Sequence, residues 1–177
     1  MTVIFTDIVG FTPLSSRLKP TELVALLDGL FTSFDALVAR FGGEKIKTIG
    51  DAYMVVVGAP GPRTDHVEVA ARIALAIREQ ARAFPLVNGQ QLSVRLGVDT
   101  GPVVTGVIGQ HKFAYDLWGD AVNTASRMES HGEPDRIHVT EAMAARLNSR
   151  FQLVPRGEIA VKGKGPMRTF WLEGASV

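Results

Sequence analysis

The segment FTDIVGF, residues 5–11, ends an apolar run with a carboxylate, Asp7, which is followed three residues later by a glycine. A second segment, TIGDAYMVVVG at residues 48–58, repeats the arrangement, with Asp51 after a glycine at the start of another apolar run. Hard divalent cations such as Mg2+ bind oxygen ligands and often use only one or two carboxylates together with substrate phosphates. The two segments therefore indicate two strands whose ends share a cation, although aspartate is also a common residue of ordinary turns.

The composition is that of a compact protein without a strong electrostatic field. The 177 residues suffice for a single domain, 1–177, with a sizeable core. The 19 basic and 18 acidic residues nearly balance, so we expect no binding to nucleic acid and no membrane contact by this domain. Cysteine is absent, which excludes disulfides and thiolate metal sites. Because Met1 is followed at once by an apolar strand, we expect the domain to come from a longer parent.

The spacing of apolar residues predicts helices that alternate with strands, followed by a strand-rich end. Leucine and phenylalanine recur every three or four positions over 20–41, which is typical of an amphipathic helix, and Gly42 and Gly43 would end it. A second helix is expected over 65–84, with Asp65 and Glu68 as a capping box. The other expected elements are strands 44–50, 52–58, 92–100 and 102–109, the segment 113–120, a helix from about 121, strand 136–140, a short helix 141–147 and strands 151–155, 158–163 and 167–173. This order predicts an α+β sandwich of a mixed β-sheet with packed helices.

Two basic motifs suggest contact with an anion. Asn123 and Arg127 are four residues apart, so they lie on one face of the helix that begins near 121. Polar residues on a solvent-exposed face of a helix have the same four-residue spacing, so this alternative stays open. The turn VKGKG places Lys162 and Lys164 among glycines, where backbone can approach a polyphosphate, but it lacks the Walker spacing and also suits a basic surface turn.

The remaining polar candidates have ordinary structural explanations as well. Lys45 and Lys47 are expected to share one face of their strand, because strand side chains alternate with period two. Lysines on an edge strand also oppose aggregation. Asp116 lies between two apolar neighbours, where a carboxylate needs a partner. The four histidines show no metal-ligand spacing and are expected at the surface: His66, His111, His131 and His138.

Four motifs in this order, FTDIVGFT, EKIKTIGDAYM, YDLWGDAVNTASRME and VKGKG, resemble the catalytic domain of class III nucleotidyl cyclases. The resemblance extends over nearly the whole chain and rests on four motifs in register. It implies a ferredoxin-like, palm-type α+β fold. It also implies a wreath-like dimer whose two active sites lie at the interface, each built from both subunits.

The resemblance implies a role for several residues of this sequence. Asp7 and Asp51, with the backbone carbonyl of Ile8, match positions that hold two divalent cations, Mg2+ or Mn2+. Lys47 and Asp116 match positions that read the purine in adenylyl cyclases. The other matches are Asn123 and Arg127 for the ribose and the reacting phosphate, and Arg95 and Lys162 for the outer phosphates.

The implied activity is that of an adenylyl cyclase, which converts ATP into 3',5'-cyclic AMP and pyrophosphate. Guanylyl cyclases of the family tend to carry glutamate and cysteine, or a similar residue, where this chain carries Lys47 and Asp116, so we expect ATP to be preferred over GTP. One chain type supplies every matched residue, which implies a homodimer with two sites. We expect a cytoplasmic domain, held at the inner face of the plasma membrane if the parent has membrane helices.

Two other functions compete with this interpretation. A catalytically silent member would bind nucleotide or a partner cyclase, but such proteins usually lack a metal aspartate or the Asn/Arg pair, and this chain keeps both. A diguanylate cyclase also has a palm-like core with acids at strand ends. Its GGDEF signature does not occur in this sequence.

Overall fold

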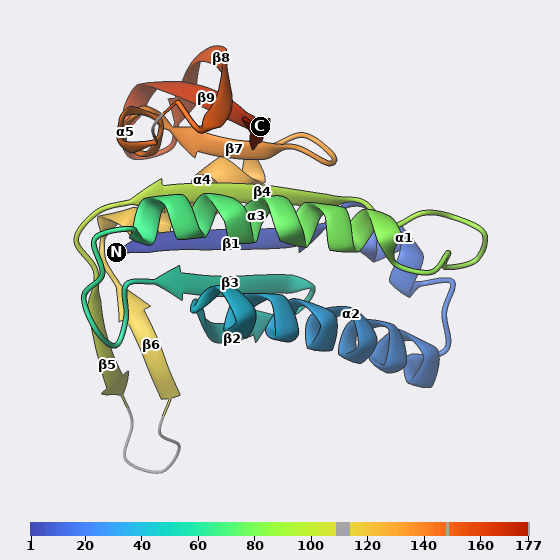
Figure 1. Ribbon diagram of the computed structural model, residues 1–177. Coiled ribbons are helices and arrows are strands. Elements are labelled where there is room, and N and C mark those ends of the chain that lie inside the picture. The colour runs from blue at the N-terminus through green and yellow to red at the C-terminus, as the bar shows by residue number, and fades with distance from the viewer. Residues whose placement is uncertain (109–113, 148, 177) are drawn as a thin grey trace.

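The computed structural model describes residues 1–108, 114–147 and 149–176 (Figure 1). Its elements in chain order are β1 (Thr2–Ile8), α1 (Phe11–Ser15), α2 (Pro20–Phe41), β2 (Glu44–Ile49), β3 (Ala52–Val57), α3 (His66–Ala83), β4 (Val94–Thr100), β5 (Val104–Ile108), β6 (Ala114–Trp118), α4 (Asp120–Ser130), β7 (Ile137–Thr140), α5 (Glu141–Arg146), β8 (Phe151–Val161) and β9 (Gly165–Ala175).

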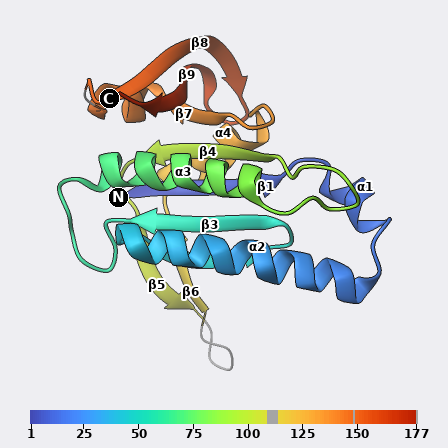
Figure 2. The ribbon, with the colours of Figure 1, turned by 45° about the vertical axis from the view of Figure 1, so that its right-hand side comes forward.

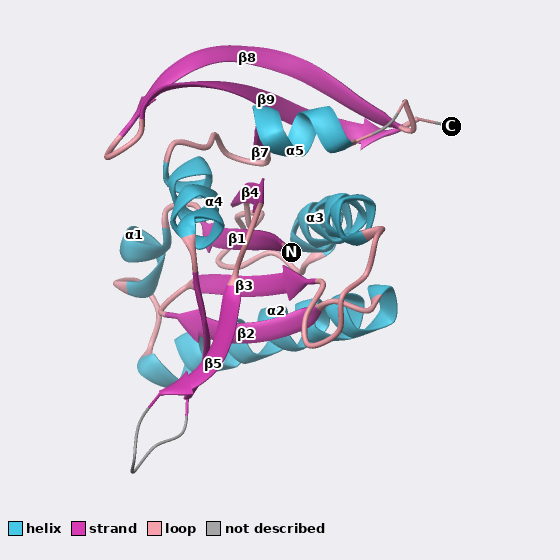
Figure 3. Ribbon diagram, turned by 90° about the vertical axis from the view of Figure 1, so that its left-hand side faces the viewer, coloured by secondary structure: helices cyan, strands magenta, loops and turns pink. Residues whose placement is uncertain are grey.

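Seven strands form one mixed sheet in the order β2-β3-β1-β4-β7-β9-β8. Strand β1 lies between β3 and β4 and is antiparallel to both, whereas β4 and β7 are parallel. Helices α2 and α3 cover one face of the sheet, and α4 lies on the opposite face (Figure 3). The predicted α+β sandwich of a mixed sheet with packed helices is therefore confirmed.

Alternate residues of β1 face opposite sides of the sheet. Ile4 is buried in the main core, which α2 and α3 cover, whereas Val3 and Phe5 belong to a smaller core with Ala125 of α4. Because strand side chains alternate, Asp7 lies on the same side as Val3 and Phe5. The strand therefore presents its terminal carboxylate on the face that α4 covers.

Helix α4 packs directly against the backbone of β4 at Gly97. A Cβ atom at this position would lie 2.0 Å from the backbone nitrogen of Glu129 and 2.3 Å from the carbonyl oxygen of Ala125. A residue without a side chain permits this close approach of helix to strand. The contact fixes the position of α4 over the sheet.

We expect Gly97→Ala to lower the free energy of unfolding by about 3 kcal/mol or more, because backbone rather than a flexible side chain blocks the added methyl group. Urea denaturation followed by circular dichroism measures this change. Gly61→Ala is the matched control, since a Cβ there meets no atom within 4 Å, and it should change stability by less than about 0.5 kcal/mol. Equal stability of the two variants would contradict the close packing of α4 on β4.

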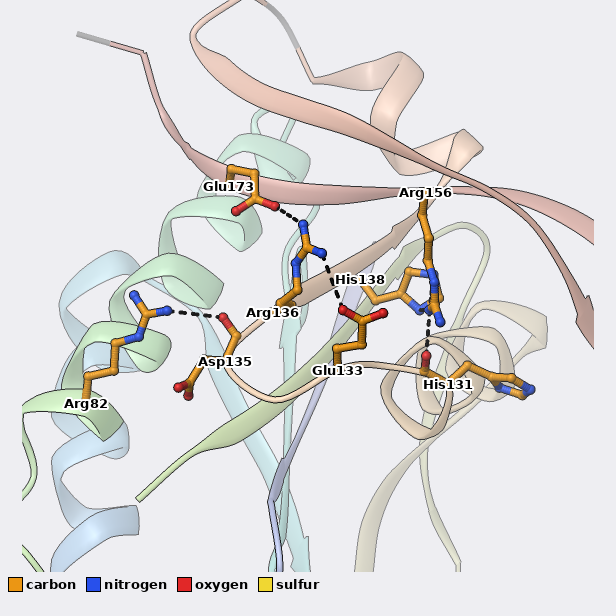
Figure 4. A network of polar contacts seen from close by, with 8 residues as sticks. All are labelled: Arg82, His131, Glu133, Asp135, Arg136, His138, Arg156 and Glu173. Carbon is orange, nitrogen blue, oxygen red and sulfur yellow. Dashed lines mark hydrogen bonds and ion pairs between the residues drawn. The ribbon is translucent and has the colours of Figure 1, made fainter. Parts of the chain in front are cut away.

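The expectation that His138 lies at the surface is wrong. Its side chain is 0% exposed, and its Nδ1 donates a hydrogen bond to the Met128 carbonyl of α4 at 2.8 Å. Arg156 of β8 lies 3.2 Å from the same ring and donates to the His131 carbonyl at 2.5 Å (Figure 4). Burial lowers the pKa of His138 to about 4, so the ring is neutral near pH 7. Strands β7 and β8 thus hold the C-terminal end of α4.

The other three histidines divide into two cases. The side chains of His66 and His131 are half-buried. His111 lies outside the described residues.

The predicted helix boundaries agree closely with the structure, but one predicted cap does not. Helix α2 spans the predicted range, and α3 is one residue shorter at each end than expected. Asp65 makes no side-chain cap, because its carboxylate instead accepts a hydrogen bond from Arg63 at 2.7 Å. The capping box of Asp65 and Glu68 is therefore not formed.

Two other local predictions differ from the structure. The segments 151–155 and 158–163, predicted as separate strands, belong largely to one strand, β8, because pairing with β9 continues across a register shift between Pro155 and Gly157. The short helix α1 was not predicted. Its five residues are too few to show helical periodicity.

Strands β5 and β6 form a separate two-stranded sheet that projects away from the main sheet (Figure 2). Strand β6 leads directly into α4 through Gly119. None of the described helices has both the length and the apolar character needed to cross a membrane.

Candidate active site

The carboxylates of Asp7 and Asp51 lie at the same end of the strands, where β1 ends and β2 turns into β3. Burial, followed by hydrogen bonding with Asp7 and by the charge of Asp7, raises the pKa of Asp51 to about 6. Two adjacent carboxylates repel each other when both are ionised, and a divalent cation between them removes that repulsion.

These residues fit a divalent cation that also binds oxygens of a substrate. Among the described residues, no group of three or more histidines or acids is arranged to hold a metal ion alone. Two carboxylates are enough for Mg2+ when phosphate oxygens complete the coordination. The side chain of Ile8 is 2% exposed and belongs to the core, so only its backbone carbonyl is available as a further ligand.

Arg95 occupies the space beside Asp7. The two residues are opposite each other on β4 and β1, and the guanidinium donates a hydrogen bond from Nη2 to Asp7 Oδ2 at 2.7 Å. On its other side, Arg95 Nε lies 3.3 Å from Oε1 of Glu129, a residue of α4. Burial, followed by the charge of Asp7, raises the pKa of Glu129 to about 7. The structure thus places Arg95, predicted from the resemblance to bind phosphates, between two carboxylates.

Sequence analysis did not single out Glu129, although the sequence contained a signal. Ala121, Ala125 and Met128 are buried on the side of α4 that faces the sheet. Glu129 follows Ala125 by four residues, so it lies on the same side, where a carboxylate requires a partner. An acid on the apolar side of this helix was therefore a candidate for a buried ion pair.

Lys47 and Asp116 form an ion pair that links β2 to β6. Burial opposes ionisation of Asp116, yet the hydrogen bonds from Lys47 and from the Leu117 backbone amide lower its pKa below the usual value. The partner that the half-buried carboxylate of Asp116 requires is thus Lys47. Both predicted purine-reading residues lie together.

The expectation that Lys45 and Lys47 share one face is wrong. The pairing of β2 with β3 shifts by one residue between them, so Lys45 is opposite Val55 and Lys47 is opposite Met54. Such a bulge interrupts the period-two alternation of the strand. Lys45 pairs instead with Asp35 of α2, on the far side of the sheet from Asp116.

Asn123, Arg127 and Lys162 line one cavity of about 330 Å3 between α4 and the turn that joins β8 to β9. The side chains of Asn123 and Arg127 are exposed, on the side of α4 that faces away from the sheet. Lys164 of the same turn is paired with Asp120 at the first residue of α4. Neither Asp7 nor Asp51 lines this cavity, so the residues predicted to bind the nucleotide here and the two aspartates form separate parts of one chain's surface.

Residues 1–174 match the family model of the adenylate and guanylate cyclase catalytic domain. With the mixed sheet and the two strand-end aspartates described above, the chain belongs to this family of enzymes, the class III cyclases. An adenylate cyclase of Mycobacterium tuberculosis is 49% identical over 175 residues, which are 99% of this chain and 40% of that protein. Human atrial natriuretic peptide receptor 2 is 48% identical over 179 residues, 98% of this chain and 17% of the receptor. The chain therefore spans less than half the length of these relatives.

Solved structures of cyclase domains superpose closely on this chain. The guanylate cyclase domain of RhGC from Catenaria anguillulae, in complex with GTP, has a TM-score of 0.95 at 39% identity, covering 99% of this chain and 96% of that one. The catalytic core of a rhodopsin-guanylyl cyclase with converted specificity, in complex with ATPαS, has a TM-score of 0.93 at 41% identity, covering 98% and 94%. The overall likeness includes adenylyl and guanylyl cyclases alike, so individual residues must decide which base is preferred.

Proposed function

We propose that this chain is an adenylyl cyclase domain that converts ATP into 3',5'-cyclic AMP and pyrophosphate. The observation that carries the proposal is the ion pair between Lys47 and Asp116. It sets a hydrogen-bond donor beside an acceptor at the two positions that we propose read the purine. Adenine offers the complementary pattern, an acceptor at N1 and a donor at N6, whereas guanine offers the opposite pattern.

The half-buried position of the pair strengthens this preference. The side chains of Lys47 and Asp116 are 39% and 24% exposed, so guanine would face two partly desolvated polar groups with the wrong hydrogen-bond pattern. Sites that leave such groups unpaired discriminate by as much as roughly 10^4-fold in favourable cases. A base bound here would insert between the two side chains and exchange their mutual contact for contacts with its own edge.

The reaction is an in-line phosphoryl transfer within one nucleotide. The ribose 3'-hydroxyl loses its proton, its oxygen bonds to the α-phosphorus, and the bond from that phosphorus to the bridging oxygen of the β-phosphate breaks as pyrophosphate leaves. Divalent cations held by Asp7, Asp51 and the Ile8 carbonyl would lower the pKa of the hydroxyl and neutralise phosphate charge.

The residues on α4 and the last hairpin supply positioning and positive charge. Asn123 would orient the ribose, and Arg127 would stabilise the charge that grows on the reacting phosphate. Lys162, in the same cavity, would bind the outer phosphates. Their common cavity is large enough for phosphate groups and is mainly positive, since its one carboxylate, Asp120, is paired with Lys164.

Two copies of the chain would complete each site. The surface with Asp7, Asp51 and Glu129 holds three carboxylates against Arg95, whereas the cavity of Arg127 carries more cations than carboxylates. These opposite charges favour an antiparallel, head-to-tail arrangement in which one subunit would supply the aspartates and its partner the residues that bind the nucleotide.

The arm formed by β5 and β6 supports a homodimer. Val104, Val107 and Trp118 are 68%, 55% and 37% exposed on this projecting hairpin. Exposed apolar side chains that gather on one element are typical of an interaction surface. A second copy of the chain would bury them.

The test is cyclic nucleotide formation by the purified chain with ATP and with GTP, in Mg2+ and in Mn2+, over a range of protein concentrations. We expect cyclic AMP, with a specific activity that rises with concentration because the sites form at the dimer interface. A folded dimer that binds ATP but forms no product would instead identify a catalytically silent member. Cyclic GMP as the main product would refute the proposed base preference.

A further inference from the structure

We propose that Glu129 is a positioning residue that draws Arg95 away from Asp7 so that a divalent cation can bind Asp7. The inference rests on the proposed function only in taking Asp7 and Asp51 as the cation ligands. In the structure the guanidinium of Arg95 contacts both carboxylates, with a hydrogen bond to Asp7 and an ion pair with Glu129. In the proposed exchange it gives up the first contact and completes the second.

The first contact joins the guanidinium to Asp7, a carboxylate that would bind the cation. Its Nη2 donates to Asp7 Oδ2 at 2.7 Å, and the Asp7 side chain is only 18% exposed. Hydrogen bonds between charged partners are about twice as strong as neutral ones. A cation that binds Asp7 must therefore displace or compensate this contact.

The second contact is already an ion pair, but it is not aligned as a hydrogen bond. Arg95 Nε and Glu129 Oε1 are 3.3 Å apart, yet neither atom has a hydrogen-bond partner, and both are buried. Buried polar atoms are nearly always paired in folded proteins, so two unpaired atoms of opposite character side by side need an explanation. A small rotation of the guanidinium toward Glu129 would align this donor with its acceptor.

The backbone of Glu129 is fixed in place, and Arg95 is the more exposed partner of the ion pair, at 31% against 13% for Glu129. The backbone nitrogen of Glu129 lies against Gly97, where an added Cβ would come within 2.0 Å of it. Gly97 is two residues after Arg95 on β4, so the helix and the strand are locked together close to the ion pair. The Arg95 side chain, by contrast, is 31% exposed. The arginine is thus the movable partner.

The charges around Arg95 favour its shift from Asp7 toward Glu129 when a cation binds. Arg95 contacts Asp7 and Glu129, and Asp51 adds a third carboxyl group near enough to act on Glu129 through its charge. A cation held by the two aspartates therefore adds positive charge where acidic groups outnumber basic ones. The cation and Arg95 would repel each other across Asp7, and Glu129 offers the nearest other carboxylate. With Arg95 held by Glu129, the guanidinium stays beside the cation, where the outer phosphates of a nucleotide would meet it.

The test measures binding of Mn2+ alone, by electron paramagnetic resonance without nucleotide, to the wild-type chain and to four variants, one of them a control. We expect Glu129→Gln to weaken Mn2+ binding by about tenfold or more, because the guanidinium then stays on Asp7. Arg95→Gln should tighten binding, since it removes the competitor. In the Arg95→Gln background, Glu129→Gln should change the affinity by less than about threefold.

Three outcomes would overturn the proposal. Glu129→Gln could leave Mn2+ affinity unchanged, or weaken it equally in both backgrounds, as a simple loss of negative charge near the site would. If Glu129→Gln fails to fold, Arg95→Gln decides alone, and an unchanged or weaker affinity refutes competition by the guanidinium. Glu133→Gln is the matched control, because Glu133 pairs with Arg136 instead, and it should leave Mn2+ binding unaltered.

The test of Glu129 and the test of cyclase activity can fail independently of each other. A chain that forms cyclic AMP but gives equal effects in both backgrounds would refute the role of Glu129 and leave the cyclase activity standing. A chain that shows the predicted Mn2+ pattern but forms no cyclic nucleotide would do the reverse.

Discussion

Replacing Lys47 by glutamate together with Asp116 by cysteine is expected to turn the preference of the chain from ATP toward GTP. Glutamate accepts hydrogen bonds where Lys47 donates, and the thiol donates where Asp116 accepts, so the pair then matches guanine. The ratio of kcat/KM for ATP to that for GTP should fall by roughly 10^4-fold in the most favourable case. Separate measurement of cyclic AMP and cyclic GMP from each triphosphate gives this ratio.

Lys45→Gln is the matched control for the base preference. Lys45 lies on the same strand, but the bulge turns it to the other face, where it pairs with Asp35. Its loss should leave the ratio of ATP to GTP unchanged. A double variant at Lys47 and Asp116 that retained the preference for ATP would count against these two residues as the reader of the base.

Asp7→Asn and Arg127→Ala should each reduce cyclic AMP formation by roughly 10^3-fold, because each removes charge that the transition state requires. Mixing the two inactive variants should restore about a quarter of the wild-type activity if subunits exchange freely. Half of the randomly paired dimers would then contain one subunit of each kind. Each mixed dimer has one site with both Asp7 and Arg127 intact, and a second site that lacks both.

Asp7→Asn mixed with Asp51→Asn provides the control for complementation. Both changes fall in the same part of the site, so every mixed dimer has one defect in each site and no activity should return. Recovery with the first mixture but not with the second would support sites shared between subunits. Absence of recovery in both, with exchange of subunits verified by mass, would contradict them.

The main elements of the fold could be predicted from the periodic spacing of apolar residues in the sequence. Helix α2 has apolar residues at helical spacing over its whole length, and glycine follows it at the end. Strands β1 and β3 are short apolar runs with turn residues between elements, so their type was evident. The cap at Asp65 could not be predicted, because Arg63 competes for the same carboxylate and sequence alone does not rank the two contacts.

The candidate site residues, and the pairing of Lys47 with Asp116, could be predicted only from the resemblance to a known family. The pairing of Lys47 with Asp116 joins strands 69 residues apart, and no local pattern relates them. Glu129 was not predicted although an acid on the apolar side of its helix indicates a buried ion pair, and its partner could not be named because Arg95 lies on a strand in another part of the sequence. His138 was misplaced at the surface because a single strand of four residues does not reveal that both its faces are covered.

The sequence by itself determined the type and order of the main elements, the absence of cysteine chemistry and the two carboxylates at strand ends. These properties depend on neighbouring residues, through apolar periodicity and turn preference. The tertiary structure decided which face Lys47 takes, because the bulge in β2 forms only when that strand pairs with β3. It also decided that Arg95 lies between Asp7 and Glu129, since that contact exists only where β1, β4 and α4 pack together.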